Sequence, residues 1–304
     1  MEILILTKFK AVKSMRPFLK WAGGKRQLLP YIKEYINEDA LNGVKFYEPF
    51  IGGGSLFFHL QHGDSIINDF NAEIVNCYKV IKTAPKKLIK QLKVHQENHC
   101  KEYFYKIRSM DRTGEIDNMT NVEKAARTIY LNRTCYNGLY RVNLAGQFNT
   151  PMGRYANPLI CDEENILEIS KFLKENKTTI RCCDFAEAVK DAKEGDWVYF
   201  DPPYDYEGSG FVGYVKEGFS HADLERLKDT CDELISKGCQ VLVSNNDTKF
   251  VRKIFSSDNY EIVYETKVIK ANRNINSKRS KRKKVDEVLI HGRPVNKISI
   301  SSSK

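Results

Sequence analysis

The order of apolar segments in this 304-residue chain predicts a doubly wound α/β fold with a helical insert and a C-terminal β-hairpin. Short runs of β-branched and aromatic residues alternate with helical periodicity over most of the chain. Residues 83–157 break this alternation and are rich in Lys, Arg, His, Asn and Tyr. Two alternating runs, 261–269 and 285–291, follow each other without a helix between them. We therefore expect a largely parallel sheet, interrupted once by helices and closed by a hairpin.

The composition allows a large core and favours a polyanionic partner. Hydrophobic residues make up 41% of the chain and charged residues 29%, with a formal charge of +10 and a pI near 9.0. Nucleic acid is therefore the first candidate partner. The eight cysteines include no C-x-x-C pair, which indicates a reducing compartment without structural zinc. No run has the length of a signal-peptide core or a membrane span, so we expect a cytoplasmic, non-membrane protein.

The first strands lead into a glycine turn and an acidic residue. The run 46–50 precedes Gly52, Gly53 and Gly54, whose backbone can approach a ligand closely. The spacing G-x-G-x-x-G is absent, which disfavours a dehydrogenase and leaves a compact cofactor without a pyrophosphate. The next strand, 65–68, ends at Asp69. This carboxylate is placed either to bind ribose hydroxyls or to cap a helix from Ala72.

The middle of the chain is predicted to form a polar, mostly helical lobe. We expect one helix over 84–105, a second over 121–130 and an irregular segment over 132–155. That segment interleaves basic and amide side chains with aromatics, a pattern suited to base edges, phosphates and stacking. The alternative is a polar surface lobe without a ligand.

Two further strands end in acidic motifs. The run 179–183 precedes Asp184 and Phe185, which can serve a ligand or merely cap and pack the helix from Ala186. The run 196–200 precedes Asp201, Pro202, Pro203 and Tyr204. The prolines stiffen the backbone and leave carbonyls free beside a carboxylate and an aromatic face, a corner suited to a planar amine. The alternative is a rigid turn.

The rest of the chain is predicted to add a mobile glycine-containing loop over 205–214, a helix from Phe219-Ser220 to Lys237 and a fifth strand over 240–244. Nine basic residues and no acidic one lie from Lys267 to Lys284. Such a run forms either a solvated loop or a phosphate clamp.

Four motifs in one order give the chain a resemblance to a known family. Phe18 to Lys25, Glu48 to Gly54, Asn137 to Arg141 and Asp201 to Tyr204 together resemble the Dam-type DNA adenine-N6 methyltransferases, over about residues 16–291. Those enzymes recognise GATC and act alone or beside a restriction endonuclease. The resemblance implies the seven-stranded, Rossmann-like methyltransferase sheet.

The resemblance also implies a domain layout. Residues 16–82 and 158–293 would form the catalytic domain, and residues 83–157 the helical DNA target-recognition domain. Residues 1–15 would be an N-terminal tail and residues 294–304 a disordered one.

By resemblance, each site falls on specific residues of this chain. S-adenosyl-L-methionine would be bound by Trp21, Lys25, Glu48, Pro49, Phe50, Gly52, Gly53, Gly54, Asp69, Asp184, Phe185 and Asp201. The catalytic residues would be Asp201, Pro202, Pro203 and Tyr204. DNA would be contacted by Lys20, Arg133, Tyr136, Asn137, Leu139, Arg141, Asn143, Asn149, Arg154, Lys281, Arg282, Lys283 and Lys284.

The expected reaction is methyl transfer to N6 of an adenine flipped out of double-stranded DNA, as in the site-specific adenine-specific DNA methyltransferases. We expect no metal, a monomer bound to DNA, and either no protein partner or a restriction endonuclease acting on the same site. Two alternatives stay open: methylation of RNA adenine or a protein amide, and a sequence-specific DNA-binding protein that has lost catalysis.

Overall fold

The structure is a computed structural model that describes residues 15–21, 25, 28–37, 39–206, 219–256, 261–272 and 284–295. Of residues 271, 272, 284 and 285 it describes the backbone alone. Three predicted features therefore lie outside the described residues: most of the glycine-containing loop over 205–214, the side chain of Lys284, and Lys281, Arg282 and Lys283.

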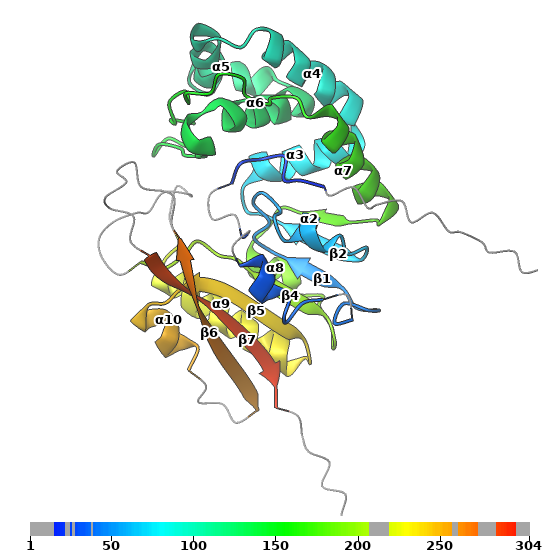
Figure 1. Ribbon diagram of the computed structural model, residues 1–304, viewed down its shortest axis with the longest axis vertical. Helices are drawn as coiled ribbons and strands as arrows, with labels where there is room; N and C mark the ends of the chain where they lie inside the picture. Colours follow the sequence, from blue (N-terminus) through cyan, green and yellow to red (C-terminus); the bar gives the residue numbers. More distant parts are fainter. Residues whose placement is uncertain are drawn as a thin grey trace, which may run out of the picture.

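A seven-stranded mixed sheet forms the centre of the molecule and confirms the predicted α/β fold (Figure 1). Its strand order is β3-β2-β1-β4-β5-β7-β6. The strands are β1 (Phe46–Glu48), β2 (Ser65–Asn68), β3 (Thr179–Arg181), β4 (Trp197–Phe200), β5 (Gln240–Asn246), β6 (Ile262–Asn272) and β7 (Lys284–Pro294). The first five pair in parallel, and β7 runs antiparallel between β5 and β6.

The order of the parallel strands reverses between β1 and β4. The chain proceeds from β1 outward to β2 and β3, then returns to the other side of β1 and continues through β4 to β5. Phe46 of β1 is in register with Ser65 of β2 on one side and Trp197 of β4 on the other. In open α/β sheets, ligands bind beyond the carboxyl ends of the strands at such a reversal. The predicted motifs after β1, β2, β3 and β4 all follow carboxyl ends.

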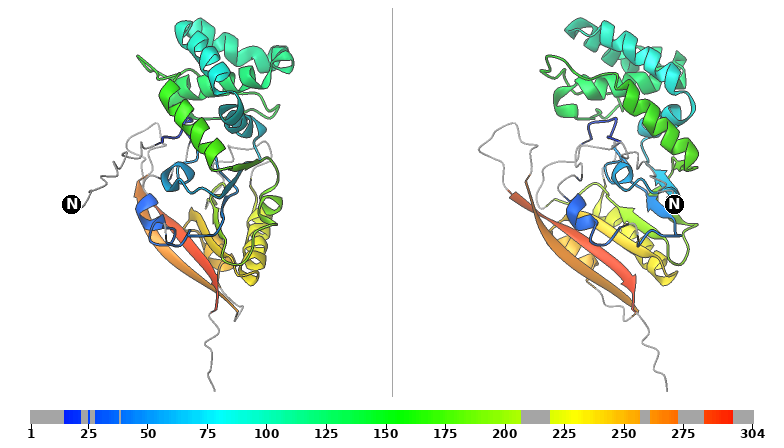
Figure 2. Two further views of the ribbon diagram at one scale, coloured as in Figure 1. Left: turned by 90° about the vertical axis from the view of Figure 1, so that its right-hand side faces the viewer. Right: turned by 45° about the vertical axis from the view of Figure 1, so that its right-hand side comes forward.

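Helices cover both faces of the sheet because side chains alternate across each strand (Figure 2). On one face Val198 and Phe200 pack against α8 (Phe185–Val189), α9 (His221–Ser236) and α10 (Lys249–Ile254). On the other face Trp197 and Tyr199 pack with residues of α1 (Leu29–Ile32). That face also carries α2 (Phe57–Leu60), α3 (Ala72–Thr83) and α7 (Glu163–Glu175).

The predicted helical lobe consists of α4 (Pro85–Glu97), α5 (Lys101–Thr113), the 3-10 turn η2 (Glu115–Asn118) and α6 (Asn121–Thr134). The prediction of one helix over 84–105 was wrong, since the chain breaks at Asn98-His99-Cys100. Cys100 is extended and caps α5 by accepting from the amide of Tyr103. A capping box of Thr120 and Glu123 starts α6. One hydrophobic cluster runs from this lobe into α3 and α7, so the lobe is packed onto the sheet domain.

The irregular segment after α6 folds back beneath the lobe. It begins with the 3-10 turn η3 (Tyr136–Gly138) and has isolated bridges between Cys135 and Met152 and between Val142 and Phe148. Residues 141–149 form a narrow antiparallel loop closed at Arg141 and Asn149, which we call the recognition hairpin after the role predicted for this segment.

The predicted end boundaries shift slightly. Met15, which we assigned to the N-terminal tail, is 7% exposed and packs in the core. Pro294, which we assigned to the C-terminal tail, pairs with Ile262 as the last residue of β7. Over the described ranges, no helix is long and apolar enough to cross a membrane.

Candidate functional site

The glycine turn after β1 packs tightly against Trp21. Gly52 has φ +45° and Gly54 has φ +71°, values that favour glycine. A Cβ at Gly52 would lie 2.7 Å from the indole of Trp21, and one at Gly53 would lie 2.9 Å from the Trp21 Cβ. A Cβ at Gly54 would meet the Tyr78 hydroxyl at 2.5 Å. The turn therefore packs its bare backbone, which is buried, directly against an indole; its role as a ligand cradle stays a prediction.

Asp69 holds this turn in place. Its carboxylate accepts hydrogen bonds from the amides of Gly52 and Asn71, each at 2.9 Å. The alternative in which Asp69 caps the helix from Ala72 was wrong, because Asn71 is the N-cap of α3. Burial raises the pKa of Asp69 to about 6, against the opposing effect of the two amide bonds.

Glu48, at the end of β1, is a buried carboxyl with an unmet acceptor. It is 3% exposed, and its Oε2 has no hydrogen-bond partner among the residues that the structure describes. Burial raises its pKa, and the charge of Asp201 adds to this effect. A buried oxygen without a donor requires an explanation, and a ligand amine or hydroxyl at the strand ends would supply one.

The Asp201 to Tyr204 corner follows β4 directly and is held by a set of polar contacts. Asp201 Oδ1 pairs with Lys25 Nζ at 2.8 Å and accepts from Ser244 Oγ at 2.8 Å. Lys25 also donates to the Tyr204 hydroxyl at 2.6 Å, and that hydroxyl donates to Glu287 Oε2 at 3.3 Å. Burial raises the pKa of Tyr204, so the phenol stays protonated at neutral pH. Sequence reasoning did not find Ser244 or Glu287, which come from β5 and β7.

The chain after Tyr204 is anchored to the end of β5. The amide of Asp205 donates to Asn245 Oδ1 at 2.9 Å, and its carboxylate pairs with His221 Nε2 at 3.1 Å and accepts from Thr248. Asn246 donates to the Asp205 carbonyl. Asp205, Asn245 and Thr248 were missed because nothing adjacent in sequence shows that they meet.

Asp184 and Phe185 have the structural roles that we weighed as alternatives. Asp184 caps α8 by accepting from the amide of Ala186 at 3.0 Å, and it binds Arg226 bidentately at 2.7 and 2.9 Å. Phe185 is 4% exposed between Phe50, at 5.5 Å, and the guanidinium of Arg226, at 4.2 Å. A cofactor role for both residues remains a prediction. Pro49 contributes its carbonyl to Asn68 at 3.0 Å.

The turn η3 packs against Lys20 and leaves Tyr136 outward. Gly138 has φ +65°, and a Cβ there would lie 2.4 Å from the Lys20 side chain. Lys20 Nζ lies 3.8 Å from the Tyr155 ring and donates to the Arg133 carbonyl at 3.3 Å. Burial lowers the pKa values of both Lys20 and Arg133. These two predicted DNA contacts are therefore partly engaged inside the protein.

The other predicted DNA contacts lie toward the surface. Tyr136 is 43% exposed, Asn137 and Arg154 are exposed, and Leu139 is half-buried. Arg141 Nε donates to Asn149 Oδ1 at 2.6 Å across the recognition hairpin. These residues occupy one continuous part of the chain around the hairpin.

Asn143 lies in the predicted segment and makes several hydrogen bonds within it, and its contact with DNA stays a prediction. Its Oδ1 accepts from the amides of Ala145 and Gln147, and its Nδ2 donates to Gln147 Oε1 at 3.0 Å. An amide side chain with this many internal bonds shapes the tip of the hairpin, so its capacity to contact a base is reduced.

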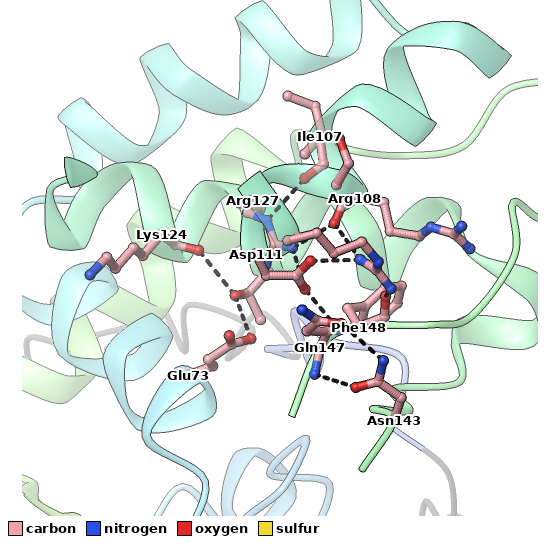
Figure 3. A network of polar contacts seen from close by, with 12 residues as sticks. Glu73, Ile107, Arg108, Asp111, Lys124, Arg127, Asn143, Gln147 and Phe148 are labelled. Carbon is pink, nitrogen blue, oxygen red and sulfur yellow. Dashed lines mark hydrogen bonds and ion pairs between the residues drawn. The ribbon is translucent and has the colours of Figure 1, made fainter. Parts of the chain in front are cut away.

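A buried ion pair fixes the recognition hairpin to the lobe (Figure 3). Arg127 of α6 is 1% exposed and pairs with Asp111 of α5 at 2.9 Å. Asp111 Oδ2 also accepts from the amide of Phe148 at 2.8 Å, and Arg112 donates to the Phe148 carbonyl at 2.7 Å. Both backbone groups of Phe148 are therefore held by side chains of α5, a clamp that the sequence did not reveal.

In the ranges that the structure describes, no three His, Cys, Asp or Glu side chains are grouped so that they could hold a metal ion.

Comparison with known proteins agrees with this geometry. A family profile described as D12 class N6 adenine-specific DNA methyltransferase matches residues 21–275. The chain is 47% identical over 279 residues to the type II methyltransferase M1.LlaDCHI of Lactococcus lactis subsp. cremoris, covering 91% of this chain and 95% of the relative. It is 39% identical over 285 residues to the type II methyltransferase M.MjaIII of Methanocaldococcus jannaschii, covering 88% and 96%.

A further relative carries a different name. The DNA adenine methylase of Escherichia coli K12 is 31% identical over 288 residues, covering 93% of this chain and 97% of the relative. With a match across most of its length and the strand-end motifs assembled on one sheet edge, the chain belongs to the family of D12 class N6 adenine-specific DNA methyltransferases.

Proposed function

We propose that this protein transfers a methyl group from S-adenosyl-L-methionine to N6 of an adenine flipped out of double-stranded DNA, within the sequence GATC. The observation that carries the proposal is the placement of the Asp201 to Tyr204 corner beside the glycine turn of Gly52 to Gly54, at the reversal of strand order. A stiff acceptor corner and a bare-backbone cradle at one sheet edge suit an amine acceptor and a compact cofactor.

The chain's residues fit the cofactor that we propose. Among the described residues Glu48 Oε2 has no hydrogen-bond partner, so a ligand hydroxyl or amine could bond to it. The Trp21 indole lies directly against the backbone of Gly52 and Gly53 and offers an aromatic surface to a ligand. S-adenosylmethionine would supply a methyl group on a sulfonium whose departure as a neutral thioether requires no metal. The residues that would hold it are those named from the sequence: Trp21, Lys25, Glu48, Pro49, Phe50, Gly52, Gly53, Gly54, Asp69, Asp184, Phe185 and Asp201.

Asp201 is the residue that we propose to activate the amine. Among the residues that the structure describes, Lys25 and Ser244 both contact Oδ1 of Asp201, and Oδ2 would accept an N–H of the adenine. A carboxylate held at Oδ1 needs no reorganisation when the amine arrives. The Pro202 carbonyl would accept the second N–H, and the Tyr204 ring would stack on the flipped base.

Arg141 and its neighbours would read the target. A guanidinium can bind O6 and N7 of guanine bidentately, and Asn149 orients this one from across the hairpin. Tyr136 is exposed and could enter the base stack left by the flipped adenine. Lys281 to Lys284 would add contacts to phosphate.

The activity test uses labelled cofactor and two duplexes that differ only in GATC, followed by digestion to nucleosides. We expect N6-methyl-2′-deoxyadenosine from the GATC duplex alone. In parallel reactions with RNA or protein as the acceptor, label there and none in either duplex would favour the first alternative substrate class. Tight cofactor and DNA binding without turnover would indicate a protein that has lost catalysis.

Arg141→Ala separates base reading from phosphate contact. If Arg141 reads a guanine, its loss should lower kcat/KM on GATC by an amount equivalent to about 1–3 kcal/mol, with little effect on a duplex altered at that guanine. A parallel loss on both duplexes at fixed salt would remove Arg141 from the recognition set.

The names of the relatives bear on the biological setting. Two similar proteins are named type II methyltransferases, and others are named DNA adenine methylases. We propose that this enzyme acts as a monomer in the cytoplasm on chromosomal or invading DNA, with a restriction endonuclease of the same specificity as its candidate partner. Co-purification and gel filtration would test both points.

A further inference from the structure

Tyr140 lies between the glycine turn and the recognition hairpin and touches both. Its ring centroid is 5.4 Å from that of Trp21 and 5.7 Å from that of Phe148. It is 7% exposed, and its hydroxyl donates to Glu73 Oε2 at 3.0 Å. Burial and the charge of Glu73 raise the pKa of Tyr140, so the phenol remains a donor at neutral pH. A large side chain at this point transmits any displacement of one neighbour to the other.

Glu73 leads back to the glycine turn by a second route. It lies in the first turn of α3, where its amide donates to the N-cap Asn71 at 3.0 Å. The amide of Asn71 donates to Asp69, which also accepts from Gly52. Gly52 in turn contacts the indole of Trp21, against which the Tyr140 ring packs. These contacts form a closed path that runs from Gly52 to Tyr140 through Glu73 and returns to Gly52 through Trp21.

The same glutamate is also tied to the helical lobe. Thr128 of α6 donates to Glu73 Oε2 at 3.3 Å, and Figure 3 shows Glu73 reaching toward this helix from α3. Arg127, the residue before Thr128 in α6, pairs with Asp111, which holds Phe148. Glu73 of α3 is therefore the carboxylate that accepts from both Tyr140 and α6.

We propose that the hydrogen bond between Tyr140 and Glu73 couples the two sites, so that filling the cofactor cradle strengthens binding of the target duplex. This inference rests on the proposed function, because it requires both a cofactor and a DNA site. A ligand packed on Trp21 and the Gly52 backbone fixes the indole. The Tyr140 ring passes this restraint to Phe148 of the hairpin only while its hydroxyl bond to Glu73 anchors the ring; without that anchor the ring shifts against the indole instead. Because coupling free energies are reciprocal, the target duplex must strengthen cofactor binding by the same factor.

The test measures the dissociation constant of a fluorescent GATC duplex with and without saturating S-adenosylhomocysteine, at fixed salt. We expect the wild-type ratio to lie in the range of about 5–150-fold that is typical of allosteric coupling. Tyr140→Phe keeps both ring contacts and removes only the hydroxyl. Its ratio should fall to within about twofold of one, while each ligand still binds on its own.

Glu73→Ala tests the same bond from the other side. It should lose the coupling as Tyr140→Phe does, and the double variant should lose no more than either single one, because they remove one interaction. Tyr103→Phe is the matched control, since it removes a phenol hydrogen bond to His95 within the lobe, away from that closed path. Its coupling ratio should equal that of the wild type.

The outcomes separate this inference from the proposed function. A wild-type protein that binds S-adenosylhomocysteine and the duplex with a ratio of one would overturn the coupling and leave the function standing. So would a Tyr140→Phe variant of wild-type thermal stability with an unchanged ratio. Failure of the wild-type protein to bind either ligand would overturn the proposed function and the coupling together.

Discussion

Replacing Asp111 with alanine should destabilise the protein strongly, because it leaves a buried guanidinium without its counter-ion. Removing one partner of a buried ion pair costs about 3–5 kcal/mol. Arg127 is 1% exposed but keeps hydrogen bonds to the carbonyls of Ile107 and Arg108, so the low end, about 3 kcal/mol, applies. The amide of Phe148 also loses its acceptor, which adds about 1 kcal/mol. The expected loss is a large part of the about 5–15 kcal/mol that typically stabilises a folded protein.

Urea denaturation followed by circular dichroism measures this loss through the midpoint and slope. Asp111→Asn keeps an acceptor for the Phe148 amide and removes the charge, so it separates the two contributions. Arg112→Ala is the control, because Arg112 contacts the same groups from a more exposed position and should cost about 1 kcal/mol or less. An Asp111→Ala variant that loses no more than Arg112→Ala would refute the buried-pair reasoning.

Three further perturbations have expected outcomes. Asp201→Asn keeps the side-chain size and removes the charge, so kcat should fall by about 10²–10³ at unchanged thermal stability; near-normal single-turnover methylation would exclude the role. Since burial raises the pKa of Asp69 to about 6, S-adenosylhomocysteine should bind more weakly as the pH falls below 6, and calorimetry on Asp69→Asn should show no such dependence. Burial lowers the pKa of His95 from 6.5 to about 4, so the unfolded chain takes up this proton first as the pH falls. The free energy of unfolding should therefore drop by about 3 kcal/mol between pH 6.5 and 4. In urea titrations His95→Phe should lack that part of the decline, and an identical pH profile would contradict it.

The parallel strands and their terminal motifs were predictable from sequence because their signals are local. Buried strands are short runs of β-branched and aromatic residues, and the run before Asp201 matches β4. The glycine turn was also predictable, because the turn itself requires positive φ values at residues 52 and 54, which glycine adopts readily. Asp69 was located correctly, although only the structure showed that Asn71, and not Asp69, caps the helix.

Helix boundaries were less predictable where weak local preferences compete. The run 84–105 has helical periodicity on both sides of Asn98, yet Cys100 adopts an extended conformation and restarts the helix as α5. The cost of the break is offset by packing of Leu92 and Phe104 in one cluster, which periodicity along a single segment cannot show.

The sequence by itself determined the α/β class, the strand-end motifs and the place of the basic, amide-rich segment after α6, because each depends on residues adjacent in the chain. Tertiary structure alone decided which of these meet: Lys25 reaches Tyr204 across 179 positions, and Tyr140 reaches Glu73 across 67. It also placed β7 between β5 and β6, which brings Glu287 to the Asp201 to Tyr204 corner. Contacts of this kind form only when the whole sheet and lobe are packed, since no local preference specifies a partner so distant in sequence.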